Sequence, residues 1–341
     1  MEDVRKPGGL QGLFAPLTIR SFTSKNRFAM APMAQGVFDN GAPTPAVVAH
    51  YEARALGGVG LIITGGVIID HPLGSGETNI GRMNRGTVEA WKRLAGSVHE
   101  AGAGIFCQLW HQGPQTRPGM GPHEVTENGT VTVKAATRQD LRDVVDAYAR
   151  SAELARSAGF DGVEIHGAHG YLPDSYLREY GSSAPVSPEV TEPAFVYHVV
   201  AAVRQAVGAD FPICFRFSRW SVSPYTGDYL SSPAAMEKVL LPLREAGVDV
   251  FHASRGFDPF WPPEFPDSPL SLAGWARRLT GMPVIAVGHL GLNADESAER
   301  PGESLRALSA QFAAGQFDMI AVGRALLRDP EWCGRLAGVS S

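Results

Sequence analysis

The chain has 341 residues, of which 44% are hydrophobic and 19% are charged, so it can bury a large core and is neither disordered nor a small scaffold. Thirty Lys and Arg residues against thirty-five Asp and Glu residues give a net charge of −5 with no basic run, which argues against nucleic acid as a partner. The three cysteines show no CxxC spacing, and no apolar stretch reaches the ~18 residues that a membrane-spanning helix needs. We therefore expect a cytoplasmic protein that binds neither membrane nor nucleic acid.

Short apolar runs recur along the whole chain, and most of them follow a glycine that ends a stretch with helical spacing. Each run has the length and composition of a buried strand. The eight runs cover residues 27–31, 59–64, 104–109, 161–166, 211–217, 248–253, 283–287 and 317–322. Eight such strands alternating with helices, without a linker between halves, predict an α/β fold, namely one TIM-type (β/α)8 barrel that forms a single domain over residues 1–341.

A doubly wound open sheet is the alternative fold, but it usually needs a glycine-rich turn after its first strand. Here the first strand continues into the sequence APMA at 31–34, without a GxGxxG motif. We expect residues 1–25 to form an N-terminal cap on the floor of the barrel. Residues 110–137, rich in Gly, Pro and Thr, predict a long active-site loop at the opposite mouth.

Glycines follow the last two predicted strands, at the end of a barrel where ligands bind. Gly288 follows the seventh strand and Gly323 follows the eighth, after which Arg324 opens a helix. Free backbone N–H groups, the positive end of a helix dipole and a guanidinium together predict a phosphate site, so we expect a phosphorylated ligand. In the alternative interpretation the glycines only turn the chain, and Arg324 pairs with Asp329 on the surface.

The residues at the other strand ends narrow the chemistry of this ligand. No strand end carries a lysine, which leaves a Schiff-base aldolase or a PLP enzyme without its nucleophile. His166 and His169 could bind a metal together with Glu164, but the first strand has no His-x-His motif, so we expect no metal. A flavin is the cofactor that remains.

Six segments carry motifs that occur together in one family. They cover residues 14–19, 25–33, 57–64, 108–111, 166–172 and 321–330, and they include a His-x-x-His-Gly-Tyr motif and a Gly-Arg-x-x-Leu-x-Asp-Pro motif. In this combination the sequence resembles the Old Yellow Enzyme family of FMN-dependent ene-reductases over nearly the whole chain. The resemblance implies FMN as the cofactor and NAD(P)H as a reductant that binds transiently in the place of the substrate.

The resemblance also implies which residues hold the cofactor. They are Pro32, Met33, Ala34, Gly66, Gln108, Arg216, Gly288, Gly323 and Arg324. Gln108 is expected at the pyrimidine edge of the flavin and Arg216 at N1 and C2=O, where a fixed guanidinium stabilises the negative charge of the reduced ring. Alternatively, Gln108 is a polar residue of the barrel core with local partners.

On the substrate side, the resemblance assigns two histidines, a tyrosine and two tryptophans. His166 and His169 are expected to donate hydrogen bonds to the oxygen of an electron-withdrawing group, because neutral imidazole can polarise a carbonyl. Tyr171, whose phenol keeps its proton at neutral pH, is expected to protonate the α-carbon while flavin N5 delivers hydride to the β-carbon. Trp110 and Trp261 are expected to contact the substrate. Alternatively, Tyr171 only packs and the two histidines are structural.

These assignments predict an enzyme that reduces the C=C bond of α,β-unsaturated carbonyls, small enone-like molecules, with NAD(P)H. Two features depart from the family. Ala34 stands where Thr or Cys usually donates to flavin O4, and loss of that donor makes the flavin harder to reduce by about 1 kcal/mol. The loop at 176–185 is shorter than in the family.

These departures leave other functions open. One is a related flavoenzyme specialised in desaturation, isomerisation or dehydrogenation in a secondary-metabolite pathway. Another is a flavin-binding protein without turnover. Because relatives often form dimers or higher assemblies, a homo-oligomer is also one of the assemblies that we consider.

Overall fold

Eight parallel strands close into a barrel in the computed structural model, which describes residues 10–180, 194–221, 227–255, 262–288, 290 and 303–338. In order around the barrel they are β3 (Phe28–Met30), β6 (Leu61–Ile63), β9 (Gly104–Trp110), β13 (Gly162–His166), β14 (Ile213–Ser218), β15 (Val250–Ser254), β16 (Val284–Val287) and β17 (Met319–Val322). β17 pairs with β3, so the barrel has no open edge and a doubly wound sheet is excluded. Each strand overlaps one of the eight predicted runs, which confirms the predicted barrel.

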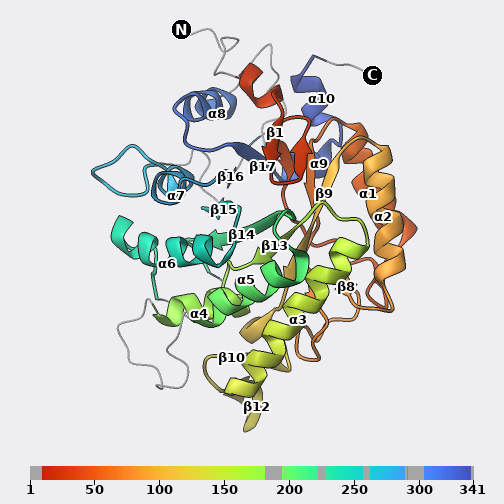
Figure 1. Ribbon diagram of the computed structural model, residues 1–341, viewed down its shortest axis with the longest axis vertical. Coiled ribbons are helices and arrows are strands. Elements are labelled where there is room, and N and C mark those ends of the chain that lie inside the picture. The colour runs from red at the N-terminus through yellow and green to blue at the C-terminus, as the bar shows by residue number, and fades with distance from the viewer. Residues whose placement is uncertain are drawn as a thin grey trace.

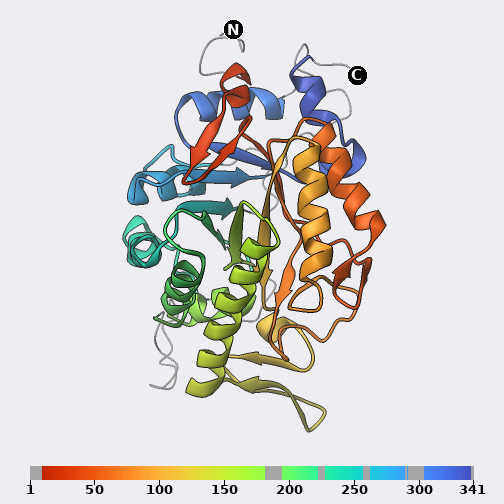
Figure 2. The ribbon, with the colours of Figure 1, turned by 45° about the vertical axis from the view of Figure 1, so that its right-hand side comes forward.

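Helices surround this barrel, as Figures 1 and 2 show. The longer ones are α1 (Pro45–Leu56), α2 (Val88–Glu100), α3 (Arg138–Ser157), α5 (Ala194–Val207), α6 (Pro233–Ala246) and α8 (Glu303–Ala313). The shorter ones are α4 (Leu172–Tyr180), α7 (Leu272–Thr280), α9 (Arg324–Arg328) and α10 (Trp332–Leu336). Within the described ranges, no helix combines the length and the apolar composition that crossing a membrane requires.

Successive side chains along each strand point alternately into two hydrophobic cores, one inside the barrel and one between strands and helices. On β6, Leu61 and Ile63 belong to the cluster inside the barrel, whereas Ile62 belongs to the larger cluster between strands and helices. The amino-terminal end of the barrel interior is filled by a hairpin, β1 (Leu17–Ile19) and β2 (Phe22–Ser24). The Phe22 ring lies 5.3 Å from the Phe106 ring inside the barrel.

The segment predicted as a long active-site loop has regular structure of its own. After η2 (Gly113–Gln115) it forms a three-stranded sheet of β10 (Gly119–Gly121), β11 (Val125–Glu127) and β12 (Thr130–Ala135). The turn between β11 and β12 contains Asn128 and Gly129, both with positive φ, which is the conformation that a tight hairpin favours. The Thr-Val alternation of β12 supplies the strand pattern. In both views this sheet lies at the opposite end of the molecule from α8 and α10 (Figures 1 and 2).

Candidate active site

Side chains from the predicted motifs meet at the carboxyl ends of β9 and β13. The ring of His166, the last residue of β13, lies 5.1 Å from the His169 ring and 4.8 Å from the Tyr171 ring. Trp110, the last residue of β9, packs edge to face against Tyr171 at 4.7 Å. The fold thus brings four of the five residues predicted on the substrate side into one aromatic cluster. Trp261, the fifth, lies outside the described residues.

The backbone holds His169 in an unusual conformation. Its φ is 64°, in the left-handed region that residues with a Cβ rarely adopt. Its N–H donates to Ser218 Oγ at 2.8 Å, and that hydroxyl donates to the carbonyl of Trp220 at 2.6 Å. The imidazole stacks on the Trp220 ring at 4.3 Å, and its Nε2 lies 2.9 Å from Ser254 Oγ. The ring is therefore fixed on several sides.

The protonation states of this cluster follow from burial and from Arg216. Burial and the nearby Arg216 guanidinium hold the pKa of His166 and that of His169 well below the usual value, so both imidazoles are neutral at neutral pH. Burial and the carboxylate of Glu77 raise the pKa of Tyr171. The cluster therefore offers two neutral imidazoles and a phenol that keeps its proton.

Arg216 supplies a buried positive charge at the carboxyl end of β14. It lies opposite His166 in the β13–β14 pairing, and its Nη2 is 3.4 Å from Ser254 Oγ. Its Nε is buried and has no hydrogen-bond partner, and neither has Nδ1 of His166, among the residues that the structure describes. Because buried donors are rarely left unpaired, an acceptor from a bound molecule is expected at Arg216. A flavin pyrimidine edge fits this requirement.

Glu164 forms a hydrogen-bonding hub inside the barrel, one inward position below His166. Its side chain is fully buried. One carboxylate oxygen accepts from Gln108 Nε2 at 2.7 Å, and the other accepts from His252 Nδ1 at 2.7 Å and from Cys214 Sγ at 3.2 Å. The sequence suggested Glu164 only as a possible metal ligand, and this hub was not predicted. The period-2 alternation of β9, β13, β14 and β15 could have revealed it, because all four side chains point inward.

Three members of this hub, Glu164, Cys214 and His252, have ligand atoms within 4.8 Å of one another. A metal would require the thiolate form of the cysteine. Burial and the adjacent carboxylate instead raise the pKa of the Cys214 thiol well above its usual value. Without a metal ion, the group forms a hydrogen-bonded cluster in which a neutral thiol and an imidazole donate to a carboxylate.

The glycines after β6 allow two chain segments to pack closely. A Cβ added at Gly65 would lie 2.2 Å from the carbonyl oxygen of Met33, and one added at Gly66 would lie 2.3 Å from the Trp110 ring. Only glycine fits these positions without movement of backbone or of a buried indole. Ala34, the next residue after Met33, is exposed beside them. The segment 32–34 and Gly66, both predicted to contact the flavin, are therefore neighbours.

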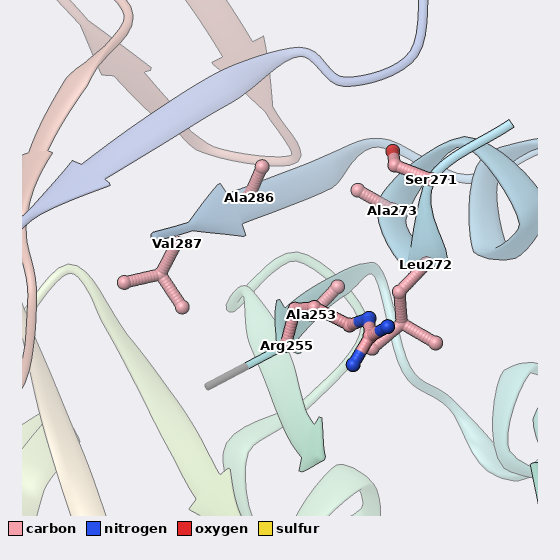
Figure 3. A pocket seen from close by; sticks show the side chains of 7 residues that line it. All are labelled: Ala253, Arg255, Ser271, Leu272, Ala273, Ala286 and Val287. Atoms are coloured by element: carbon pink, nitrogen blue, oxygen red, sulfur yellow. The ribbon is translucent and has the colours of Figure 1, made fainter. Parts of the chain in front are cut away.

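The predicted phosphate site lies where β16 and β17 end side by side. Gly323 precedes α9, and Arg324 is exposed. Asp329 pairs with Arg335, so the surface pair of Arg324 and Asp329 considered in the sequence analysis is not found. Figure 3 shows a pocket that is lined by the end of β15, by the end of β16 at Ala286 and Val287, and by the start of α7.

A buried ion pair on α4 connects the Tyr171 loop to the end of β14. Asp174 accepts from Arg178 Nε at 2.7 Å, from the Gly170 N–H at 2.6 Å and from the Tyr229 hydroxyl at 2.8 Å. Arg178 Nη2 in turn donates to the carbonyl of Ser218 at 3.0 Å. The side chains of the pair are 0% and 5% exposed, so its charges are hardly screened by water. The segment that carries Tyr171 is therefore tied to the strand that carries Arg216.

His111, directly after β9, is buried in neutral form. Its Nδ1 accepts from the Gly113 N–H at 3.0 Å, and its Nε2 lies 3.2 Å from Nδ1 of His71. Burial, with a smaller contribution from His71, lowers the pKa of His111 to about 3. The unfolded chain would take up this proton near pH 6.5. Below that pH the unfolded state binds more protons than the folded state, so His111 destabilises the fold increasingly between pH 6.5 and 3.

We therefore expect His111→Gln to flatten the dependence of the unfolding free energy on pH between 6.5 and 3, by up to about 1.4 kcal/mol per pH unit. Urea unfolding at a series of pH values measures this slope. His198→Gln, on the exposed face of α5, is the matched control and should leave the slope unchanged. Equal slopes for wild type and His111→Gln would contradict the assignment of His111 as a buried neutral histidine.

The structure has a closed parallel barrel, the buried guanidinium of Arg216, and the glycines Gly288 and Gly323 after the last two strands. This combination is typical of barrel enzymes that bind a cofactor at the carboxyl ends of their strands. Comparison with known families makes this specific. The family model described as NADH:flavin oxidoreductase / NADH oxidase matches residues 12–339. The chain belongs to this family and is an FMN-dependent NAD(P)H oxidoreductase, which confirms the predicted cofactors.

Relatives agree with this assignment, and a solved structure agrees with the fold. An NADPH dehydrogenase from Geobacillus thermodenitrificans is 33% identical over 94% of this chain and 92% of the relative. An NADH oxidase from Thermoanaerobacter brockii is 32% identical over 94% of this chain, which spans only 50% of that longer relative. The crystal structure of an Old Yellow Enzyme from a Pichia species superposes with a TM-score of 0.79 at 21% identity, covering 96% of this chain and 87% of that one. The last likeness confirms the fold.

Proposed function

We propose that this chain transfers hydride from NAD(P)H to the C=C bond of α,β-unsaturated carbonyl compounds. The observation that supports this reaction is the convergence of three groups at one mouth of the barrel. The rings of His166 and His169 lie 4.8 and 6.5 Å from the ring of Tyr171, and the two histidines are buried while the tyrosine is partly buried. Two neutral donors and one protonated phenol are the groups that polarisation of a carbonyl and protonation of its α-carbon require.

FMN fits the floor of this mouth because Arg216 presents a buried guanidinium whose Nε lacks a partner among the described residues. When bound, FMN supplies the hydride chemistry between NAD(P)H and the β-carbon of the substrate. Arg216 stabilises negative charge at the pyrimidine edge of the ring, and Gln108 hydrogen-bonds that edge. The remaining groups proposed to hold the ring and the phosphate are Pro32, Met33, Ala34, Gly66, Gly288, Gly323 and Arg324.

The substrate is proposed to lie between the flavin and the aromatic cluster. His166 and His169 donate hydrogen bonds to its carbonyl oxygen through their N–H groups, and these donors stabilise the negative charge that develops there. Tyr171 holds its proton at the phenolic oxygen and gives it to the α-carbon. Trp110, together with Trp261, contacts the carbon skeleton.

The test is anaerobic stopped-flow spectroscopy of the FMN-loaded protein. We expect NADPH or NADH to bleach the flavin absorbance, and 2-cyclohexenone to restore it with a rate that saturates with enone concentration. A flavin that is reduced by NAD(P)H but not reoxidised by the enone would overturn the proposed acceptor. It would favour a specialised desaturase or isomerase, for which Ala34, exposed and unable to donate to flavin O4, is the supporting observation. A flavin that neither coenzyme reduces would point to a binding protein without turnover.

A further inference from the structure

We propose that Glu164 is a positioning residue that sets the reduction potential of the bound flavin, by fixing the orientation of the Gln108 amide and by offsetting the charge of Arg216. This inference rests on the flavin site described above, but not on the identity of the electron acceptor. It gives a role to Glu164, which the proposed reaction does not use.

Glu164 carries a full negative charge in a place where such a charge is costly. Despite its burial, Glu164 has a pKa that is lowered to about 2, first by the electrostatic interaction with His252 and the hydrogen bond from it, and then by the charge of Arg216 and the hydrogen bond from Gln108. Burial holds the pKa of His252 below its usual value, so that this imidazole is neutral at neutral pH and donates through Nδ1. The hub therefore has a net charge of −1, which lies beside the +1 of Arg216.

The charge of Glu164 dictates which end of the Gln108 amide faces it. A carboxylate can only accept hydrogen bonds, so the atom 2.7 Å from Glu164 Oε1 has to be the amide nitrogen, Nε2. The carbonyl oxygen of Gln108 is consequently directed away from the hub. Because N3 of oxidised and reduced flavin carries a proton, this carbonyl is an acceptor for N3–H. Glu164 thus prepares Gln108 to accept from the pyrimidine edge rather than to donate to it.

Glu164 also limits how strongly Arg216 favours reduction of the flavin. Two-electron reduction places negative charge near N1 of the ring, and an uncompensated guanidinium would stabilise it strongly in a buried site. The electrostatic attraction between Glu164 and Arg216, which acts across neighbouring strands β13 and β14, offsets part of that effect. Removing the negative charge of Glu164 should therefore make the flavin easier to reduce.

The test compares Glu164→Gln with wild type as FMN-loaded proteins, by measuring the midpoint potential against a reference dye and the FMN affinity by flavin fluorescence. In Glu164→Gln we expect reduced FMN to gain at least tenfold in affinity relative to oxidised FMN, which raises the potential by about 30 mV for a two-electron couple. Cys214→Ser is the matched control, because it perturbs the same hub but keeps a donor and the net charge. A Glu164→Gln potential equal to that of wild type and Cys214→Ser would overturn the proposal.

Glu164→Asp keeps the inference testable if Glu164→Gln does not retain FMN. The shorter side chain keeps the charge but can no longer reach Gln108 Nε2, so the amide loses its fixed orientation. We expect weaker FMN binding in this variant, and wild-type affinity would contradict the role of Glu164 in orienting Gln108. Both measurements are made without enone, so their outcome is independent of whether enones are the substrates.

Discussion

Tyr171→Phe is expected to slow the reoxidation of the reduced enzyme by an enone about 10²- to 10⁴-fold, the range typical for loss of a general acid. The ring contacts of Tyr171 with Trp110 and His166 remain in the variant, so only the hydroxyl is lost. Reduction of the flavin by NAD(P)H needs no proton from the phenol and should stay near the wild-type rate. Stopped-flow measurement of the two half-reactions separates these effects.

Tyr148→Phe provides the control for this experiment. Tyr148 is fully buried on α3, in the core outside the barrel, and its hydroxyl has no hydrogen-bond partner among the described residues. Loss of this hydroxyl should change neither half-reaction. If Tyr171→Phe also left enone reduction unchanged, Tyr171 would be a packing residue and the proton would have to come from water.

Arg178→Met is expected to lower the free energy of unfolding by about 3–5 kcal/mol, because it leaves Asp174 as an uncompensated buried charge. The variant also loses the hydrogen bond from Arg178 to the Ser218 carbonyl, which supports the backbone that holds His169. Urea unfolding at fixed FMN saturation measures the effect, since bound cofactor itself stabilises the folded state.

The double variant Asp174→Asn with Arg178→Met should recover part of this loss, because no buried charge is then left unpaired. The Arg117–Glu127 pair supplies a matched comparison, since its side chains are 43% and 48% exposed. Arg117→Met should lower the free energy of unfolding much less than Arg178→Met, because water screens an exposed pair. Similar costs for the two single variants would show that burial of the α4 pair adds nothing to its contribution.

Much of the fold could be predicted because its strands are buried on both faces and therefore read as continuous apolar runs. The aromatic cluster could also be predicted, since His166, His169 and Tyr171 lie within six residues of one another in the sequence. The small sheet containing β12 was missed because Gly and Pro around it suggested a loop, although Asn128 and Gly129 mark a hairpin turn.

The contacts that support the site could not be predicted from the sequence in the same way. Glu164 and His252 are 88 residues apart, and Glu164 and Gln108 are 56 residues apart, so their hydrogen bonds depend on strand register around the closed barrel. The contact of Arg178 with Ser218 depends likewise on how α4 packs against the end of β14. Local sequence patterns predict which side chains point inward, but not which of them meet.

The Phe22 hairpin at the amino-terminal end has a consequence for the order of events in catalysis. A Cβ at Gly104 would lie 2.1 Å from the Phe22 ring, so this end is plugged tightly by aromatic packing. Within the described part of the chain, the proposed flavin site is therefore approached from the carboxyl ends of the barrel strands. Under the proposed function, in which NAD(P)H binds in the place of the substrate, the oxidised coenzyme would leave before the acceptor binds, and the reducing equivalents would stay on the protein in the interval.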